Sequence, residues 1–361
     1  MSRRRTWTST ESSLEVAIVG CGGIAHEHLI ALSRIEAVSV SAVCDVSAAT
    51  AEFVARRYGV TDWFGTIDEM LDRQRPRVVH VLTPPHTHGI IVRRALEAGC
   101  HVICEKPLAP DALETIELLE LANEQGLELI ESQNLLFNDS VLDIDRLVAA
   151  GRLGEVREVD VSLCLDLTAG PFGDQNLAGP GVRLRGGAVH DFLPHLAYLY
   201  LHFAKTGSDP VDGVCGTLTN RSGNRRVGFD SLDALVDSGR CRGRLHVASD
   251  VEPSCFRLRV SGMAGSVETD LYNPYLRLEG RPNAGQLAPL EQIRTGRDFI
   301  WAGFENLRNK VGRHGTMHGL QRMLMAFYSA LDAGQPPPIT SDDIVATARL
   351  VDQLVSLQRA L

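Results

Sequence analysis

Residues 14–25 read Leu-Glu-Val-Ala-Ile-Val-Gly-Cys-Gly-Gly-Ile-Ala, an apolar run that leads straight into glycines. The run over 14–19 predicts a buried strand, and the G-x-G-x-x-A spacing after it is typical of a turn that opens a helix. Gly20 permits the tight turn, Gly22 lets the backbone approach a pyrophosphate, and Ala25 allows the helix to pack closely on the strand. The N–H groups at the start of that helix would then bind phosphates. The candidate phosphate-binding residues are Gly20, Gly22, Gly23 and Ile24.

Outward from this stretch, as far as residue 132, short apolar runs alternate with amphipathic helical stretches. This alternation predicts a parallel sheet with crossover helices. Capping residues support the helices, because Ser47 precedes a stretch that stops at Gly59 and Thr66 forms a capping box with Glu69. We therefore expect a doubly wound α/β domain over 14–134, preceded by a disordered tail over 1–13. The predicted strands span 14–19, 38–44, 78–82, 101–104 and 127–130.

Asp45 follows the predicted strand 38–44 and is the candidate ligand of the adenine ribose. A carboxylate at this place accepts hydrogen bonds from the ribose hydroxyls, which favours NAD over NADP. Arg56 and Arg57, on the next helix, form no obvious clamp for a 2′-phosphate. The alternative is that Asp45 only starts a turn. The sequence thus predicts NAD as the cofactor, with NADP less favoured.

Two polar groups close neighbouring strands of the predicted sheet. Thr83-Pro84-Pro85-His86-Thr87-His88 follows the strand over 78–82, and Glu105-Lys106-Pro107 follows the strand over 101–104. The carboxyl ends of parallel strands face the ligand crevice, so both groups should lie near the nicotinamide. Lys106 is one of only three lysines among 36 basic residues. An ordinary surface turn is the alternative. The cofactor-binding candidates in these groups are Thr83, Pro84, Pro85, His88, Glu105 and Lys106.

Beyond residue 150 the hydrophobic pattern changes from continuous runs to alternation. Residues 157–167 and 256–261 alternate apolar with polar side chains, which is typical of half-buried strands in an antiparallel sheet. We therefore expect a second, α+β domain over 135–361 with a large open, mostly antiparallel sheet, serving substrate binding and oligomerisation. Further strands are predicted over 211–219, 231–237, 243–249 and 266–271, and helices over 190–203, 320–332 and 342–361.

The order of these motifs resembles the Gfo/Idh/MocA family of oxidoreductases. The resemblance continues in Gly186-Gly187-Ala188-Val189-His190-Asp191-Phe192-Leu193-Pro194-His195, which is similar to the family's double glycine followed by a D-x-x-x-H pair. It implies a Rossmann domain and reversible hydride transfer between nicotinamide and a secondary hydroxyl of a sugar, cyclitol or nucleotide-sugar. Two departures lie near the expected substrate. Leu193 stands where the family usually has glycine, and 182–185 replace its Trp-Arg element.

The resemblance also implies roles for three residues. His195 is the candidate acid/base, because an imidazole titrates near neutral pH. Lys106 would donate a hydrogen bond to the reacting oxygen, although some family members use the lysine itself as base. Asp191 would orient the substrate or the base, since four-residue spacing places it on one helical face with His195. The alternative for Asp191 and His195 is a surface ion pair.

Three further residues are candidates for contact with substrate. Arg183 and Arg185 precede the D-x-x-x-H pair, and guanidinium groups suit a carboxylate or a phosphate, so they indicate an anionic substrate. The alternative is that they keep a loop soluble. His190 is either a substrate contact or, as we prefer, a packing residue.

For the remaining clusters of histidines and apolar residues we expect no bound ligand. His26-Glu27-His28 lies where i and i+2 residues do not share a helix face, so we expect no metal there. The apolar residues Phe299, Trp301, Phe304 and Leu307 indicate core or subunit contact. Because open sheets tend to bury an exposed face by pairing, we expect a homodimer or homotetramer through the second sheet.

Composition bounds the class of protein. The 361 residues are 44% hydrophobic and 22% charged, which argues against a disordered chain, and no stretch reaches the roughly 18 apolar residues of a spanning helix. The net charge of −9 argues against nucleic-acid and anionic-membrane binders. The basic start of the chain is not followed by an apolar region, and the eight cysteines form no C-x-x-C pair. We therefore expect free thiols and a cytoplasmic protein.

Two other functions fit the same resemblance. Some relatives use NAD transiently to hydrolyse glycosidic bonds without net redox change. A ligand-sensing regulator that kept the fold and lost catalysis is the second alternative, against which Lys106, Asp191 and His195 argue.

Overall fold

The computed structural model describes residues 13–167, 184–205, 211–280, 288–312 and 318–358. Apart from Ser13, the tail expected over 1–13 lies outside the described residues. The chain divides into two compact units, the first formed by Met1–Asn134 with Met317–Ala348 and the second by Leu135–Thr316 with Arg349–Leu361.

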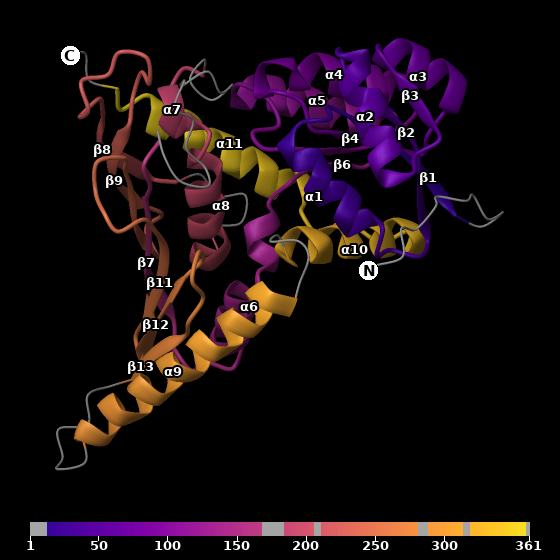
Figure 1. Cartoon of the computed structure of the whole chain (residues 1–361). Coiled ribbons are helices and arrows are strands. Elements are labelled where there is room, and N and C mark those ends of the chain that lie inside the picture. The colour runs from indigo at the N-terminus through magenta and orange to yellow at the C-terminus, as the bar shows by residue number, and fades with distance from the viewer. Residues whose placement is uncertain (1–12, 168–183, 206–210, 281–287, 313–317, 359–361) are drawn as a thin grey trace. The chain divides into compact units, whose positions relative to one another are not determined.

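The first unit is built on a six-stranded sheet in the order β3-β2-β1-β4-β5-β6, and every pair in it is parallel. The doubly wound sheet predicted from the sequence is confirmed (Figure 1). All four residues of β4 and of β5 are buried, as expected for strands covered on both faces. The strands are β1 (Leu14–Val19), β2 (Val38–Cys44), β3 (Asp62–Phe64), β4 (Val78–Val81), β5 (His101–Cys104) and β6 (Leu129–Glu131).

Side-chain caps fix the helices that connect these strands. The Ser47 hydroxyl accepts a hydrogen bond from the Thr50 N–H and the Thr66 hydroxyl accepts one from the Glu69 N–H, so both predicted caps are confirmed. Gly59 ends the second helix with a positive φ, as expected for a glycine C-cap. The helical elements are α1 (Gly23–Leu32), α2 (Ala48–Tyr58), α3 (Ile67–Gln74), η1 (Pro85–Thr87), α4 (His88–Glu97), α5 (Ala112–Glu124) and η2 (Asn134–Phe137).

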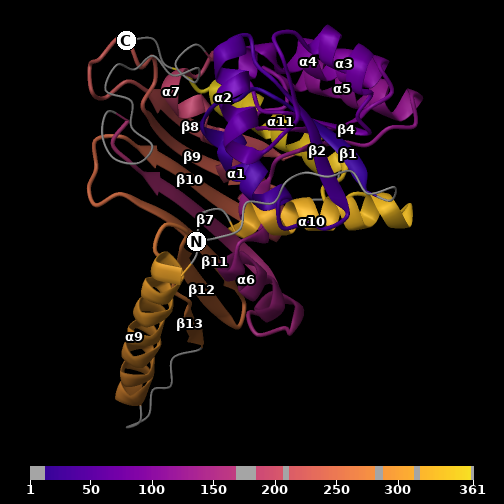
Figure 2. The same cartoon turned by 45° about the vertical axis from the view of Figure 1, so that its right-hand side comes forward.

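Two parts of the first unit differ from the expectation. The edge strand β3 was not predicted, because three residues with a half-exposed Trp63 give no clear periodicity. The helix α10 (His318–Ala333) groups with this unit, although the sequence assigned everything beyond 134 to the second domain. It does so because it packs against α1, as Figures 1 and 2 show.

The second unit contains a seven-stranded sheet in the order β13-β12-β11-β7-β10-β9-β8, whose strands are spread out in the view of Figure 2. β7 and β10 pair in parallel and the other pairs are antiparallel, so the mostly antiparallel sheet is confirmed. The strands are β7 (Val156–Cys164), β8 (Gly213–Thr219), β9 (Ser231–Asp237), β10 (Arg242–Ala248), β11 (Cys255–Gly262), β12 (Gly265–Asp270) and β13 (Arg277–Gly280).

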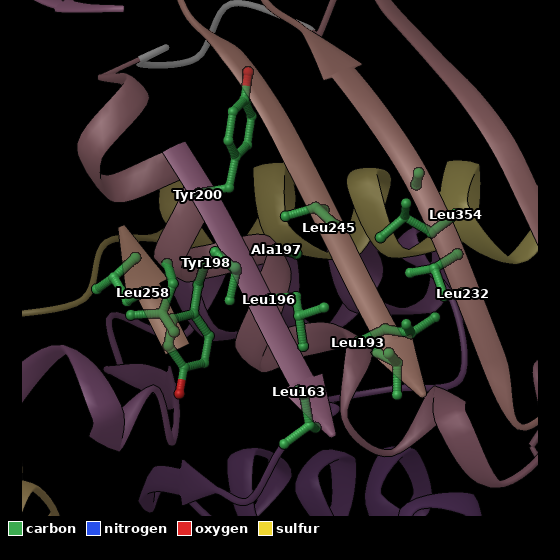
Figure 3. Packing of buried hydrophobic residues seen from close by; sticks show 14 of the residues in the cluster. Leu163, Leu193, Leu196, Ala197, Tyr198, Tyr200, Leu232, Leu245, Leu258 and Leu354 are labelled. Atoms are coloured by element: carbon green, nitrogen blue, oxygen red, sulfur yellow. The ribbon is translucent and has the colours of Figure 1, made fainter. Parts of the chain in front are cut away.

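The two faces of this sheet have different chemistry. The inward residues of β7, Val159, Val161 and Leu163, are fully buried, and Figure 3 shows their layer packed against α8 (Leu193–Ala204). The other face carries ion pairs between neighbouring strands, for example Arg242 with Glu158. The other helices are α6 (Asp139–Ala149), α7 (Gly187–His190), α9 (Ala288–Gly312) and α11 (Ser341–Val355).

The apolar cluster near the C-terminus lies on α9 and is not part of the core. Phe299, Trp301, Phe304 and Leu307 are between 44% and 68% exposed. The expectation of a core role for them is therefore wrong, and subunit contact stays a prediction. Within the described ranges, no helix combines the length and the apolar composition that crossing a bilayer requires.

Candidate active site

The glycine turn after β1 needs its first glycine for two reasons. Gly20 has a φ of +97°, which L side chains rarely adopt. A Cβ atom there would also lie 2.6 Å from the carbonyl oxygen of Leu82. The turn therefore brings the start of α1 close to the residues that follow β4.

The start of α1 forms an open cradle for an anion. A Cβ atom on Gly22 or Gly23 would meet nothing within 4 Å, and Ile24 follows in the first turn. The N-cap Gly22 supplies no side-chain cap, and the first turn carries no acidic residue. Uncapped N–H groups at the positive end of a helix dipole bind phosphate. The residues present thus fit the pyrophosphate of a dinucleotide.

Asp45 is held directly beside this turn. One carboxylate oxygen accepts from the Cys21 N–H at 2.9 Å and the other from the Ser47 N–H at 2.8 Å. These bonds fix the carboxylate, and each oxygen keeps a further lone pair for a hydroxyl donor. Burial, reinforced by the charge of Asp45, raises the pKa of the Cys21 thiol to about 12, so this thiol stays protonated. The arrangement fits a ribose diol.

His88 ties together the loops that follow β4 and β5. Its Nδ1 lies 2.7 Å from the carbonyl oxygen of Pro107, and its Nε2 lies 2.7 Å from that of Thr83. Burial lowers the pKa of His88, and the two carbonyl contacts act in the opposite direction. Both ring nitrogens thus contact backbone groups, and the histidine holds these two loops together. Thr83 is further fixed by a hydrogen bond from the Thr87 hydroxyl, across the Pro84-Pro85 turn.

Glu105 and Lys106 place opposite charges at the end of β5. The Glu105 side chain is 14% exposed, and its Oε1 lies 3.4 Å from His28 Nε2. Burial alone would raise the pKa of Glu105, but the hydrogen bond and charge of His28, with the charge of Lys106, lower it to about 2. Glu105 is therefore a carboxylate at neutral pH, next to the half-buried Lys106.

A second carboxyl group supports the backbone just after Lys106. Glu131, at the end of β6, is buried and accepts a hydrogen bond from the Leu108 N–H at 2.9 Å. Its other oxygen accepts from Gln133 at 3.2 Å. Burial raises the pKa of Glu131. This residue fixes the path of the chain beyond Pro107.

In the second unit, Asp191 and His195 do not lie on one continuous helix. The sequence predicted such a helix, but α7 ends at His190 and α8 begins at Leu193. Pro194 has no N–H to bond back to His190, and shorter bonds replace the helical ladder there. The Phe192 N–H donates to Val189 and the His195 N–H donates to Phe192.

His195 lies at the start of α8 and is half-buried. Its Nδ1 is 2.6 Å from the hydroxyl of Tyr198, and the two rings meet edge to face. Phe256 lies against the other side of the imidazole, with ring centroids 6.3 Å apart. The ring orientation of His195 is therefore set within the second unit.

The double glycine packs against the loop at 227–229. Gly187 has a positive φ, and a Cβ on it would lie 2.2 Å from the Phe229 nitrogen. His190 is 1% exposed, and its Nδ1 accepts from the Gly186 N–H. This burial agrees with the packing role preferred for His190 over direct contact with substrate.

The structure describes only one of the two arginines that the sequence suggested as contacts for an anionic substrate. Arg183 lies outside the described residues. The Arg185 guanidinium pairs with Asp352 of α11 at 2.5 Å. Its charge is thus balanced within the chain, which leaves its role toward substrate as a prediction.

The residues 14–132 match the family model described as "Oxidoreductase family, NAD-binding Rossmann fold". This stretch, about a third of the chain, is similar to the NAD-binding domain of the Gfo/Idh/MocA family of oxidoreductases. One curated relative is dTDP-3,4-didehydro-2,6-dideoxy-alpha-D-glucose 3-reductase of Streptomyces violaceoruber, 32% identical over 159 residues. The alignment covers 44% of this chain and 46% of the relative, so the chain matches about half the length of that protein.

Two solved structures share the fold of this chain. A 3-ketoreductase from Actinomadura kijaniata, solved with NADP and TDP-benzene, superposes with a TM-score of 0.73 at 22% identity, covering 96% of this chain and 98% of that one. The WlbA dehydrogenase from Bordetella pertussis, solved with NADH and UDP-GlcNAcA, superposes with a TM-score of 0.76 at 18% identity, covering 97% and 96%.

The candidate site residues form one group in each unit. The glycine turn, Asp45, Thr83 and Glu105–Lys106 gather at the carboxyl ends of β1, β2, β4 and β5. His195 belongs to the second unit and Lys106 to the first. Among the described residues, no group of three His, Cys, Asp or Glu side chains is placed to hold a metal ion.

The sequence reasoning missed His80, Tyr328 and Glu131. His80 interrupts the apolar strand Val78–Val81, and a buried imidazole requires a hydrogen-bond partner. A histidine within an apolar strand therefore indicates a buried hydrogen bond, but the sequence does not show which residue forms it.

Proposed function

We propose that this protein is an NAD-dependent oxidoreductase that transfers hydride between nicotinamide and a secondary hydroxyl of a sugar, cyclitol or nucleotide-sugar. The observation that carries the proposal is the open glycine cradle with Asp45 beside it, at the same sheet edge as Glu105 and Lys106. The names of the relatives, a reductase and a dehydrogenase of nucleotide-linked sugars, support this substrate class.

When bound, NAD+ accepts the hydride from the alcohol carbon. In our proposal His195 takes the hydroxyl proton at its imidazole, which lowers the barrier because a neutral alcohol is a poor hydride donor. Lys106 donates a hydrogen bond to the reacting oxygen and stabilises its alkoxide character. Asp191 orients the substrate or the base. Lys106 acting as the base is the alternative assignment, and pH profiles of the two variants separate the assignments.

The experiment is a turnover assay with NAD+ and a panel of sugars, cyclitols and nucleotide-sugars. The proposal expects NADH to form in a one-to-one ratio with the oxidised sugar. Turnover that releases a free sugar without net NADH would support the hydrolase instead. Binding of NAD+ with no turnover on any member of the panel would support the regulator.

We further propose that the cofactor is NAD rather than NADP. The fixed carboxylate of Asp45 suits a ribose diol and would repel a 2′-phosphate. A fluorescence titration should find NADH bound about tenfold or more tightly than NADPH. Asp45→Ser should reduce this preference, and Asp72→Ser, on an exposed position of α3, should leave it unchanged. Equal affinities in the wild type would contradict the proposal.

We also propose that two copies associate through α9. Ile293, Ile300 and Leu307 recur every seven residues and, with Phe304, form one exposed apolar stripe. In a dimer of this kind the two copies of α9 would run antiparallel, with a two-fold axis at Ile300. Ile293 of one copy would then face Leu307 of the other, and Phe304 would face Gly296. A Cβ on Gly296 would meet nothing within 4 Å, so an aromatic ring has room there. The stripe is therefore complementary to itself, as a two-fold interface requires.

Light scattering tests this contact against one through the second sheet. Ile300→Glu should convert the oligomer to a smaller species, whereas Leu113→Glu, at an equally exposed position of α5, should not. An unchanged mass for Ile300→Glu combined with dissociation of Leu235→Glu, on the outward face of β9, would assign the interface to the sheet.

A further inference from the structure

The backbone that carries Lys106 is anchored on both sides. On one side, the Glu105 N–H donates to the last carbonyl of β4 at 2.9 Å. On the other side, Pro107 has no N–H, so the first backbone donor after Lys106 belongs to Leu108. The Leu108 N–H donates to the carboxylate of Glu131 at 2.9 Å. This carboxylate is therefore the anchor on the C-terminal side of Lys106.

Glu131 is itself held by two further buried side chains. The Gln133 amide nitrogen donates to the other carboxylate oxygen at 3.2 Å, and it also donates to the Thr347 hydroxyl of α11 at 3.3 Å. The Thr347 hydroxyl donates to the Asp343 carbonyl, one turn back in α11, at 2.8 Å. Glu131, Gln133 and Thr347 are each no more than 3% exposed, and all three belong to the first unit. A continuous line of hydrogen bonds thus connects α11 with Leu108.

Each group in this line supplies what its neighbour needs. A side-chain amide has two hydrogens on its nitrogen, so Gln133 can donate to Glu131 and Thr347 at once. The Thr347 hydroxyl can accept that bond and still donate one of its own. Burial raises the pKa of Glu131, and the hydrogen bonds from Leu108 and Gln133 act in the opposite direction. These bonds therefore offset part of the cost of burying the carboxyl group.

The start of α11 gives this line a fixed end. The Thr340 hydroxyl accepts from the Asp343 N–H at 3.2 Å, and the Asp343 carboxylate accepts from the Thr340 N–H at 3.0 Å. Such reciprocal bonds form a capping box, which fixes the first turn of a helix. The carbonyl that receives the Thr347 hydroxyl belongs to this capped turn.

We propose that Glu131, Gln133 and Thr347 are positioning residues through which α11 sets the path of the backbone at Lys106. The inference rests on the proposed function, because that function gives Lys106 its role. It makes α11 part of the support of the site, although Thr347 lies 214 residues away from Gln133 in the sequence.

Thr347 allows a test that changes no charge. Thr347→Val keeps the shape of the side chain and removes the hydroxyl, whereas Thr347→Ser keeps the hydroxyl. With the substrate found in the turnover assay, Thr347→Val should lower kcat roughly two- to tenfold, the effect of one hydrogen bond, and leave the affinity for NADH unchanged. Thr347→Ser should retain the wild-type kcat. Thr115→Val is the matched control, because Thr115 of α5 is equally buried and also donates to the carbonyl four residues back.

An exchange of the carboxyl and amide groups gives a second test. In Glu131→Gln the new amide has one oxygen, so it can accept from Leu108 or from Gln133 but not from both. In Gln133→Glu two carboxyl groups face each other. Each single variant should lower kcat. The double variant should recover most of it, because the amide at position 131 can accept from Leu108 and donate to the carboxylate at position 133. A double variant no more active than the single ones would contradict the inference.

NMR follows Lys106 without any substrate, because the chain contains only three lysines. In protein labelled with ¹³C-lysine, the side-chain signal of Lys106 is assigned by its loss in Lys106→Arg. Thr347→Val should shift this signal and leave those of the other two lysines in place. Thr347→Ser and Thr115→Val should leave all three in place. A Lys106 signal that Thr347→Val does not move would overturn the inference.

These readouts separate the inference from the proposed function. A normal kcat in Thr347→Val would overturn the positioning role while the oxidoreductase proposal stands. Absence of all turnover in the wild type would overturn the proposed function, and the Lys106 signal would still decide whether α11 acts on this loop.

Discussion

The loops that end β4 and β5 differ from the segment that carries Asp191 and His195 in how their side chains are held. In the first unit the partners are distant in sequence, since Glu105 and His28 are 77 residues apart and His80 and Tyr328 are 248 apart. In the second unit the side-chain hydrogen bonds are local, since His195 contacts Tyr198 three residues on and His190 contacts Gly186 four residues back, and only the ring packing of Phe256 on His195 comes from farther along the chain.

From this difference we expect mutations at different distances to affect the two groups of residues. The ends of β4 and β5 depend on packing of the whole first unit, so remote changes should reach Glu105 and Lys106. The Asp191–His195 segment depends on its own turn geometry, so effects there should come from the residues themselves. Four sets of substitutions test this contrast, in order of decreasing effect.

His195→Gln should have the largest effect. Loss of an acid/base group costs about 10²- to 10⁴-fold in turnover. We expect kcat to fall by that amount, with NADH affinity retained and the acidic limb of the pH–rate profile lost. Tyr198→Phe, which removes only the local partner of Nδ1, should cost much less. A loss in Tyr198→Phe as large as that in His195→Gln would break the contrast between the units.

Glu105→Gln should change how stability depends on pH. The pKa of Glu105 is lowered from 4.5 to about 2 in the folded protein, so its ionised form stabilises the fold above pH 4.5. That contribution, up to about 3 kcal/mol, is lost as the pH falls from 4.5 toward 2. Urea unfolding at a series of pH values should give a flatter curve for the variant than for the wild type. Parallel curves would show that His28 does not stabilise the carboxylate.

The glycine turn offers a matched pair of substitutions. Gly20→Ala forces a Cβ against Leu82 at a positive φ and should cost about 1–3 kcal/mol of stability. Gly22→Ala meets no atom within 4 Å, so the fold should keep its stability while the affinity for NADH falls. Thermal unfolding and fluorescence titration measure the two effects. Full NADH affinity in Gly22→Ala would refute the cradle.

Arg185→Ala should have the smallest effect on stability. Its ion pair with Asp352 is partly exposed, and such pairs contribute less than about 1 kcal/mol. An anionic-substrate role predicts a raised KM for a sugar acid or nucleotide-sugar but not for a neutral sugar. An equal change in KM for the anionic and the neutral sugar would show that Arg185 does not bind the anionic group of the substrate.

The sequence predicted the elements whose signals are local. The strands Leu14–Val19, Val38–Cys44 and His101–Cys104 have the expected bounds because each is a mostly apolar run that is largely buried. The helix predicted through Asp191 was wrong because Pro194 interrupts its hydrogen bonds. Alternating residues of β7 showed which face of the second sheet is buried.

What the sequence could not reveal are contacts made by packing. His28 was considered as a metal ligand and set aside, yet its partners are His80 and Glu105. No spacing rule connects α1, β4 and α10, because their side chains meet only after the sheet and its covering helices have formed. For the apolar residues of α9 the sequence left core and subunit contact open, since composition alone does not distinguish a core helix from an apolar surface.

The central claim is that Lys106 and His195 act on the same hydroxyl group. A crystal structure with NAD+ and a substrate identified in the turnover assay tests it most directly. The account predicts that Lys106 Nζ and a ring nitrogen of His195 both lie within about 3 Å of the reacting oxygen. A reacting oxygen in contact with neither group, or with the dinucleotide bound away from the Gly20–Ile24 turn, would contradict it.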